Sequence, residues 1–384
     1  MESAIHSVGF SDNIIDIVMS DPCVSIILTG EEPALQRTEV KRPQLQPGEV
    51  LVEILCCTIC GSDLHTYDGT RSTPCPTILG HEMVGRVVDL HPEYPTVDFL
   101  NRPVKIGDRI TWSVAVACQK CEYCRRGLTQ KCTSLFKYGH QKLTDKNYLS
   151  GGLASHCHLV KGTTIFKVPA SLPDQIASPA NCATATVMAA FRLAGDIQDR
   201  SVLILGAGML GITATAVAQT KGAASVIVTD IDPQRVQRGL EFGATHSILV
   251  KKDEPLHSEV LHLTQGRGVD IVFDMTGVPE VIESGLETLD IGGTMILVGS
   301  VYPARPLQVS AEQIVRRLLK IEGIHNYVDL DLANALNFLE RYQHTYPFQK
   351  LCDQSFSLEE VLQAFEASGE HRSYRVAVLP QQKS

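Results

Sequence analysis

A short stretch early in the chain gathers several chemically active side chains. Residues 57–65 read CTICGSDLH, so that two thiols, a hydroxyl, a carboxylate and an imidazole fall close together. Two cysteines separated by two residues are typical of redox dithiols and of zinc knuckles alike. A third reading makes Cys60 one part of a site that is completed elsewhere in the chain, and this stretch alone does not decide among the three.

Further along, four cysteines lie in one short segment with a regular spacing. Cys118, Cys121, Cys124 and Cys132 form the pattern C-x2-C-x2-C-x7-C. Four thiolates this close in sequence suit a closed tetrahedral zinc site that stabilises a small lobe directly. The opening spacing is shared with iron–sulfur proteins, but the last spacing and the absence of a following proline disfavour a cluster. Free thiols without a metal are the remaining alternative.

A second set of candidate metal ligands is dispersed along the chain. His81 lies in the apolar context of residues 77–88, and Cys182 follows an asparagine much later. Together with Cys60 they supply one imidazole and two thiols. Three protein ligands leave a fourth position for water or substrate, which is typical of catalytic zinc. Taken singly, each of these residues is more often a packed core side chain.

The segment 206–211 reads GAGMLG and matches the dinucleotide-binding pattern G-x-G-x-x-G. It follows an apolar run, precedes a helical pattern and has Asp230 at the distance expected of the acidic ribose contact. Gly206 permits the tight turn, Gly208 admits the diphosphate, and Gly211 allows close packing of helix and strand. Asp230 would repel a 2′-phosphate, so NAD is expected rather than NADP, although Arg235 lies nearby.

The elements that must position these residues change character along the chain. Up to about residue 180, short β-type runs are broken by Gly and Pro. Thereafter, apolar runs alternate with helical stretches, which predicts βαβ units around a parallel sheet. The six predicted strands are Val202–Leu205, Val226–Thr229, Ser247–Val250, Asp270–Phe273, Met295–Val298 and Ile321–Ile324. A tail with helices over 332–342 and 358–368 and a strand over 375–379 is expected to return to the first domain.

Bulk composition excludes several classes of protein. The chain is 44% hydrophobic and 20% charged with a net charge of −9, and it contains no block of basic residues suited to nucleic acid. No run of apolar residues is long enough to span a membrane, and the N-terminus lacks a secretory pattern. We therefore expect a cytoplasmic protein whose 12 cysteines bind metal or remain buried thiols.

These motifs, in this order, resemble the zinc-containing alcohol dehydrogenases of the medium-chain dehydrogenase/reductase superfamily. The resemblance covers about residues 49–379 and implies an α/β protein of two domains. A discontinuous GroES-like β-barrel catalytic domain would span 1–182 and 326–384, with a zinc lobe at 112–135. A Rossmann domain with a doubly wound six-stranded parallel sheet would span 183–325. The segment His91–Pro103 is longer than the family usually carries and is expected to be a loop insertion.

The resemblance also implies roles for individual residues. Cys60, His81 and Cys182 would bind the catalytic zinc, and the four clustered cysteines would bind a structural zinc, giving two Zn²⁺ per chain. Glu82 would lie beside the catalytic metal, Asp63 would hold the free ring nitrogen of His81, and Ser62 and His65 would relay the substrate proton. The expected cofactor contacts are Gly206, Gly208, Leu210, Gly211, Asp230, Arg235, Thr186, Val298 and, against the diphosphate, Arg375. Cys57 would then be a buried thiol.

The implied function is reversible oxidation of a small alcohol to its aldehyde or ketone with NAD, by a homodimer or homotetramer. Alternatives are a lyase or epimerase that oxidises its substrate transiently, and a nucleotide-binding scaffold without catalysis. Residues 61–71 and 181–186 also resemble a clade associated with phosphonate catabolism, which implies a hydroxyalkylphosphonate substrate. Candidate cations for the phosphonate are Arg71, Arg125, Arg126, Lys137 and His140, whereas His156 and His158 are expected to be ordinary surface or core residues.

Overall fold

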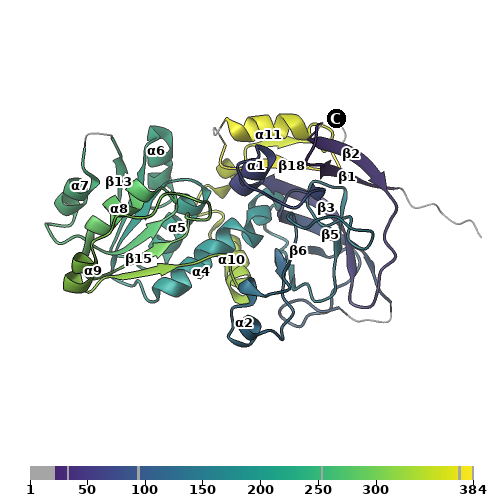
Figure 1. Ribbon diagram of the computed structural model, residues 1–384, viewed down its shortest axis with the longest axis horizontal. Coiled ribbons are helices and arrows are strands. Elements are labelled where there is room, and N and C mark those ends of the chain that lie inside the picture. Colours follow the sequence, from purple (N-terminus) through teal and green to yellow (C-terminus); the bar gives the residue numbers. More distant parts are fainter. Residues whose placement is uncertain (1–21, 33, 93–95, 252–253, 371–372, 383–384) are drawn as a thin grey trace, which may run out of the picture.

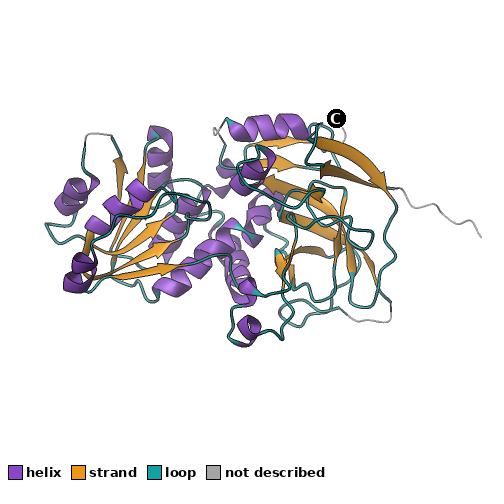
Figure 2. Cartoon of the chain, in the orientation of Figure 1, coloured by secondary structure: helices purple, strands orange, loops and turns teal. Residues whose placement is uncertain are grey.

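The computed structural model describes residues 22–382 except 33, 93–95, 252–253 and 371–372. Figure 1 shows two lobes joined by the long helices α4 (Ala183–Ala194) and α10 (Asp329–Tyr342). One lobe consists mainly of strands and loops, whereas the other is a sheet covered by helices (Figure 2). The fold class expected from the sequence is confirmed.

The helix-covered lobe contains a six-stranded sheet in the order β13-β12-β11-β14-β15-β16, in which every pairing is parallel. The central strands are apolar because helices cover both faces of the sheet. The strands are β11 (Ser201–Leu205), β12 (Ser225–Asp230), β13 (His246–Leu249), β14 (Val269–Asp274), β15 (Leu289–Leu297) and β16 (Lys320–Gly323). The helices are α5 (Met209–Thr220), α6 (Pro233–Glu241), α7 (Leu256–Leu263), α8 (Pro279–Glu287) and α9 (Ala311–Arg317). This strand order places a crevice beside the carboxyl end of β11, where dinucleotides bind in such folds.

The other lobe is built on a seven-stranded sheet that contains segments from both ends of the chain. Its order is β10-β6-β5-β3-β18-β17, and β9 also pairs with β3. The tail strand β18 pairs antiparallel with β3, so that the C-terminal segment lies beside the N-terminal strands (Figure 1). The strands are β3 (Val50–Ile59), β5 (Glu82–Leu90), β6 (Arg109–Trp112), β9 (His156–Leu159), β10 (Ile165–Lys167), β17 (Gln354–Phe356) and β18 (Val376–Val378).

Smaller elements complete this lobe. A three-stranded sheet in the order β2-β1-β4 and a two-stranded ribbon β7-β8 lie outside the main sheet. Their strands are β1 (Cys23–Leu28), β2 (Leu35–Val40), β4 (Thr77–Ile78), β7 (Ala115–Val116) and β8 (Phe136–Lys137). The helices are α1 (Gly61–Tyr67), α2 (Glu122–Arg125), α3 (Asp174–Ala177) and α11 (Val361–Gly369), with 3₁₀ helices η1 (Thr129–Lys131), η2 (Ser178–Asn181) and η3 (Phe348–Leu351).

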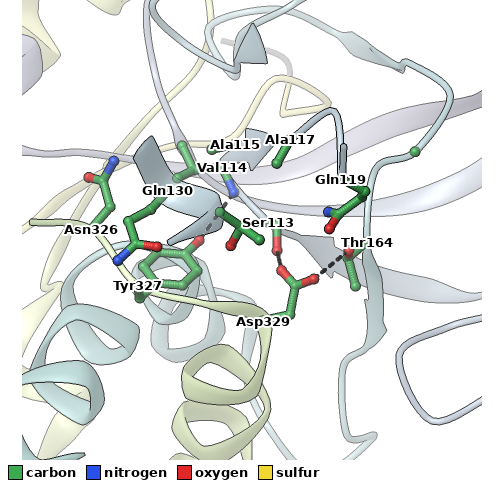
Figure 3. A pocket seen from close by; sticks show the side chains of 12 residues that line it. Ser113, Val114, Ala115, Ala117, Gln119, Gln130, Thr164, Asn326, Tyr327 and Asp329 are labelled. Atoms are coloured by element: carbon green, nitrogen blue, oxygen red, sulfur yellow. Dashed lines mark hydrogen bonds between the residues drawn. The ribbon is translucent and has the colours of Figure 1, made fainter. Parts of the chain in front are cut away.

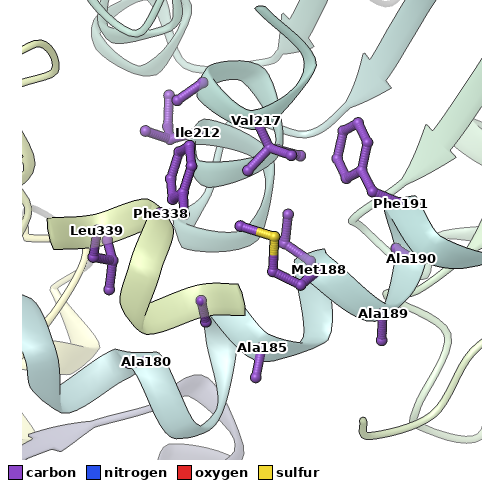
Figure 4. Packing of buried hydrophobic residues seen from close by; sticks show 14 of the residues in the cluster. Ala180, Ala185, Met188, Ala189, Ala190, Phe191, Ile212, Val217, Phe338 and Leu339 are labelled. Carbon is purple, nitrogen blue, oxygen red and sulfur yellow. The ribbon is translucent and has the colours of Figure 1, made fainter. Parts of the chain in front are cut away.

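The two lobes share a hydrophobic core at the helices that join them. Met188 of α4 packs among side chains of α5 and α10, including Ile212, Val217 and Phe338 (Figure 4). Small residues of α4, such as Ala185 and Ala189, are fully buried and allow neighbouring elements to approach the helix closely. Each large side chain buried here contributes about 1.5–3 kcal/mol. The position of α4 matters for the site because Cys182 immediately precedes it.

The expected long segment after β5 contains an isolated bridge between Val97 and Pro103 and then leads into β6. The domain boundaries expected from the sequence, 1–182 with 326–384 and 183–325, stay a prediction. None of the helices in the described ranges combines the length and apolarity needed to cross a membrane.

Candidate active site

Three segments bring one candidate metal ligand each to a common point. Cys60 follows the end of β3 and caps α1, His81 directly precedes β5, and Cys182 directly precedes α4. Their ligand atoms all lie within 4.8 Å of one another. Two sulfurs and one imidazole nitrogen converging in this way fit the open coordination set of a catalytic zinc.

Asp63 organises this triad from the first turn of α1. Its fully buried carboxylate accepts hydrogen bonds from the Cys60 amide at 3.0 Å and the Gly80 amide at 3.1 Å. It also lies 3.1 Å from Nδ1 of His81, and Nε2 of His81 lies 3.3 Å from the Cys182 sulfur. The carboxylate therefore fixes the imidazole with Nε2 turned toward the two thiols, an arrangement that tunes metal ligands in proteins.

The charge beside the triad favours a thiolate at Cys60. The Cys182 thiol, which hydrogen-bonds to the Cys60 sulfur, and the nearby Arg375 lower the pKa of Cys60 well below its ordinary value despite burial. The guanidinium of Arg375 reaches the Cys60 sulfur at 3.6 Å. A thiolate is the form of cysteine that binds metals.

Arg375 also forms a two-point ion pair with Glu82. Its Nε and Nη2 donate to the two carboxylate oxygens at 2.7 and 2.8 Å, and the Thr58 hydroxyl donates to the same carboxylate at 2.7 Å. Glu82 is fully buried, and burial raises the pKa of its carboxyl while Arg375 opposes this shift. The pair fastens the tail strand β18 to the metal site. Ligation of zinc by Glu82 and contact of Arg375 with a diphosphate stay predictions.

The two residues expected to relay a proton lie one helical turn apart on α1. The Ser62 hydroxyl is 3.4 Å from Nε2 of His81, whereas the exposed His65 contacts Thr70 at 3.1 Å and the ring of Tyr302 at 4.6 Å between centroids. Both residues line the cavity described next. Their placement is compatible with a path from the metal to solvent, and the relay itself stays a prediction.

The triad lies in a cavity of about 340 Å³ that both lobes line. Two of the sequence-predicted cations, Arg71 and Lys137, line it, and neither forms an ion pair within the described ranges. Burial and the charge of Arg71 lower the pKa of Lys137. Of the described residues that line the cavity, none is Asp or Glu. The cavity thus combines the three candidate metal ligands with two cations that have no carboxylate partner in the described part of the chain.

The other candidate cations lie elsewhere. Arg125 and Arg126 are exposed on or just after α2, where Arg126 pairs with Glu122 at 3.7 Å. The ring of His140 lies against that of His81, tilted by 37° with 4.9 Å between centroids, and its two buried ring nitrogens have no hydrogen-bond partner among the described residues. His158 contacts Glu49 at 3.0 Å, and His156 contacts Ser155 at 2.9 Å.

The glycine-rich loop joins β11 to α5 beside this cavity. Gly206 has a φ of +90°, a conformation that favours glycine. A Cβ at Gly211 would collide with the carbonyl oxygen of Gly206, whereas a Cβ at Gly208 would meet no protein atom within 4 Å. The loop is therefore packed where helix and strand meet and open where a diphosphate would approach.

The expected adenosine and nicotinamide contacts flank the loop on two sides. Asp230, at the end of β12, accepts a hydrogen bond from the Ala207 amide at 2.8 Å, and Arg235 lies 5.9 Å from the centre of the Tyr374 ring. Gly208 and the further predicted contacts Thr186, Leu210, Val298 and Arg375 line the same cavity as the metal triad. This arrangement can hold a nicotinamide against a metal-bound substrate, although each contact stays a prediction.

The four clustered cysteines form a second, separate metal-binding group. Their sulfurs also lie within 4.8 Å of one another, in a lobe that the β7-β8 ribbon closes. Amides of Cys118 and Ser134 donate to the Cys132 sulfur at 3.2 and 3.3 Å. Backbone amides of Cys124 and Thr133 lower the pKa of Cys121 to about 6. Four sulfurs without an open position suit a structural zinc.

An open metal triad beside a nucleotide crevice defines the class of a metal-dependent oxidoreductase, and the comparisons agree. Residues 46–170 match the alcohol dehydrogenase GroES-like domain, and residues 210–341 match the zinc-binding dehydrogenase domain. An L-threonine 3-dehydrogenase of Pyrococcus horikoshii is 33% identical over 80% of this chain and 84% of its own length. Another, from Shewanella baltica, is 28% identical over 90% of this chain and 96% of its own. The chain belongs to the zinc-containing alcohol dehydrogenase family of the medium-chain dehydrogenase/reductase superfamily.

Solved structures show the same architecture. An alcohol dehydrogenase from Thermotoga maritima superposes with a TM-score of 0.89 at 27% identity, covering 94% of this chain and 100% of that one. A zinc-binding dehydrogenase from Sinorhizobium meliloti with bound NADP has a TM-score of 0.82 over 94% of this chain and 100% of its own, but at 22% identity it shows the fold alone. The protein is a zinc-dependent dehydrogenase that acts on a small-molecule alcohol.

Several residues of the cavity were not among the sequence-based candidates. Tyr302, His325 and Asn326 line it from loops that follow strands of the parallel sheet. The carboxyl edge of such a sheet is where ligands bind, so position after a strand was the available signal. It does not say which loop residue faces the cavity.

Proposed function

We propose that this protein oxidises, with NAD, a small alcohol that carries an anionic group, and that a hydroxyalkylphosphonate is the first candidate. The observation that carries the proposal is the pair Arg71 and Lys137 in the cavity of the metal triad. Neither has a carboxylate partner in the described part of the chain, and the cavity lining adds no acidic side chain. Arg71 and Lys137 are partly buried. Cations that lie away from bulk water without a carboxylate partner attract an anionic ligand, with which they form charge-assisted hydrogen bonds.

The same charge pattern argues against a zwitterionic substrate. The curated relatives named above are L-threonine 3-dehydrogenases. The carboxylate of threonine would suit Arg71 or Lys137. Its ammonium group would lie near these cations, and no described residue that lines the cavity is an Asp or Glu that could bind it. L-threonine is therefore the second candidate, supported by those relatives and opposed by the charge of the cavity.

The residues of the chain divide the work of the reaction. A zinc ion held by Cys60, His81 and Cys182 would supply Lewis acidity toward the substrate oxygen. A nicotinamide bound in the cleft would supply the hydride acceptor. Asp63 keeps the His81 ring oriented, and Ser62 accepts the hydroxyl proton and passes it toward His65 at the solvent side.

The preference for NAD rests on Asp230. Its carboxylate lies at the end of β12 and already accepts bonds from the Ala207 and Asp232 amides at 2.8 and 3.0 Å. A negative charge at this place favours ribose hydroxyls and disfavours a 2′-phosphate. Arg235 opposes that discrimination, but its guanidinium lies over the Tyr374 ring.

The cellular setting is also part of the proposal. None of the 12 cysteines, all of which lie in the described ranges, forms a disulfide, which supports a reducing compartment such as the cytoplasm. Ile291, Val315 and Leu318 on the cofactor-binding lobe are 71%, 71% and 68% exposed, which supports a homodimer or homotetramer through this lobe. Sedimentation of the purified protein would measure the oligomeric state.

The test is NADH formation by zinc-replete protein with alcohols matched in size. We expect a hydroxyalkylphosphonate to have a kcat/KM at least tenfold above that of the neutral alcohol lacking the phosphonate, and above that of L-threonine. The variant Lys137→Met should remove most of this preference. Equal use of neutral alcohols, or a preference for L-threonine, would refute the anionic substrate. Oxidation of a phosphonate without net NADH release would favour transient oxidation by a lyase or epimerase.

A further inference from the structure

The segment that crosses from the parallel sheet to α10 is firmly anchored on one side and faces the substrate cavity on the other. The Tyr327 hydroxyl donates to the Asn181 carbonyl and accepts from the Val114 amide. Asp329 accepts from the hydroxyls of Ser113 and Thr164, and Figure 3 shows these contacts around a small pocket. The preceding His325 therefore enters the active-site cavity from a fixed backbone.

Among the described residues, the side chain of His325 has one hydrogen-bond partner, and that partner comes from the four-cysteine lobe. Nζ of Lys131 lies 2.7 Å from Nδ1 of His325. Lys131 ends η1 and directly precedes the metal-ligand candidate Cys132. An ammonium group has donors only, so Nδ1 must accept and Nε2 must carry the ring proton. No bond to Nε2 is present among the described residues, which leaves it available to a ligand in the cavity.

The ring is also held in its neutral form. His325 as a residue is exposed, but partial burial of its ring, followed by the positive charges of Lys131, Lys137 and Arg71, lowers its pKa to about 4. At neutral pH the ring is thus a hydrogen-bond donor without charge, in a cavity where Arg71 and Lys137 supply the charge. A neutral N–H group with a fixed direction can orient an anionic group that Arg71 and Lys137 attract by their charge.

We propose that Nε2–H of His325 donates a hydrogen bond to the anionic group of the substrate, and that Lys131 of the four-cysteine lobe positions it by fixing the ring and its tautomer. This inference rests on the proposed function for the identity of the ligand. His325 is then a substrate-binding residue and Lys131 a positioning residue. The lobe takes part in substrate recognition although none of its cysteines enters the cavity.

The kinetic test compares two charge deletions in the same lobe. Lys131→Met should raise KM for the anionic alcohol roughly tenfold, the effect of losing one well-placed hydrogen bond, with kcat within about twofold. KM for a neutral alcohol should not change. Lys120→Met is the matched control, because Lys120 is an exposed lysine of the same lobe outside the cavity. Equal rises of KM for both alcohols, or for both variants, would overturn the inference.

A second pair of variants separates positioning from folding. Gln at position 325 can donate from its amide without a fixed tautomer, so His325→Gln should retain much of the affinity for the anionic alcohol. Lys131→Met should add little in that background. Nitrogen-15 NMR of the histidine rings should show the Nε2–H tautomer for His325 in the native protein and a mixture in Lys131→Met. An Nδ1–H tautomer in the native protein would overturn the inference.

The outcomes also distinguish this inference from the proposed function. Native protein without any preference for anionic alcohols refutes the proposed function and the ligand assigned to His325 together. Native protein with that preference, undiminished in both Lys131→Met and His325→Phe, refutes only the role of His325 and Lys131.

Discussion

The two metal-binding groups of this protein have similar donors but are assembled in opposite ways. The four cysteines lie between Cys118 and Cys132, and local turns with short helices bring their sulfurs together. The open triad consists of Cys60, His81 and Cys182, which lie at the ends of β3, β5 and α4. Only the packing of these elements in the core brings the three side chains together. The first group therefore stabilises its own lobe, whereas the second depends on the whole fold for its geometry.

Their surroundings differ in the same sense. The fully buried carboxylates Asp63 and Glu82 surround the triad, with the guanidinium of Arg375 beside them. The lobe cysteines instead accept hydrogen bonds from backbone amides, such as those of Cys118 and Ser134 to the Cys132 sulfur. Buried charge around a metal tunes its chemistry, and amide–sulfur bonds in a closed site support structure. Variants in the two groups should consequently fail in different ways.

The largest effect on turnover should come from removing a ligand of the triad. Cys182→Ser should lower kcat/KM by more than about a hundredfold, beyond the loss typical of residues that only support a ligand. Bound zinc should fall from two per chain to one, while the midpoint of thermal unfolding changes little. Activity assays, metal analysis and calorimetry measure these quantities. Cys75→Ser is the control, because Cys75 belongs to neither group; an active Cys182→Ser variant would rule out the assigned ligand set.

The next effect should come from the residue that orients the triad. Asp63→Asn keeps the shape of the side chain but loses the charge that faces His81 at 3.1 Å. We expect zinc affinity or kcat/KM to fall by about 10–100-fold. Competition with a chelator would measure the affinity, and the lobe zinc should be retained. Equal loss of both metals would show that Asp63 supports the fold rather than the triad.

Replacing a cysteine of the four-cysteine lobe should lower stability while leaving most of the turnover. Cys124→Ser should lower the melting temperature by roughly 2–3 °C, the shift that a loss of about 2 kcal/mol causes in a chain of this size. At low temperature kcat should stay within about fivefold of the native value, because the triad retains its ligands. Scanning calorimetry and activity at two temperatures test this. Complete loss of kcat with unchanged stability would remove the distinction between the two groups.

The same contrast explains what the sequence could and could not predict. The lobe and the glycine-rich loop are local patterns, so spacing alone identified them, and alternating apolar runs predicted the six parallel strands. The triad needed family resemblance, because no spacing relates Cys60 to Cys182. The ion pair between Glu82 and Arg375 joins residues that are 293 positions apart in the sequence. The two side chains meet because β18, which follows Arg375, pairs with β3. The direction of His325 and Tyr302 depends on loop backbones that no periodicity describes.

The candidate cations give the sharpest case of this limit. No sequence feature distinguished Arg71, Lys137 and Arg126 as candidate ligands of an anion. In the structure, the first two line the cavity, whereas Arg126 is exposed and pairs with Glu122. The type of a side chain indicates that it can bind an anion, whereas its position in the fold decides whether it faces the substrate cavity. Placement came from the β7-β8 ribbon, which brings Lys137 back from the lobe to the triad.

The smallest expected effect tests that placement directly. Arg126→Ala removes a lobe cation whose ion pair with Glu122 spans 3.7 Å on an exposed surface, and such pairs contribute about 0–1 kcal/mol. We expect KM for a hydroxyalkylphosphonate and the melting temperature to stay within error of the native values, whereas Lys137→Met raises KM. The test is to measure KM for the phosphonate in both variants by steady-state kinetics. A comparable rise of KM in both would mean that the lobe attracts the substrate through its overall charge, and that the cavity cations are no more specific than those on the surface.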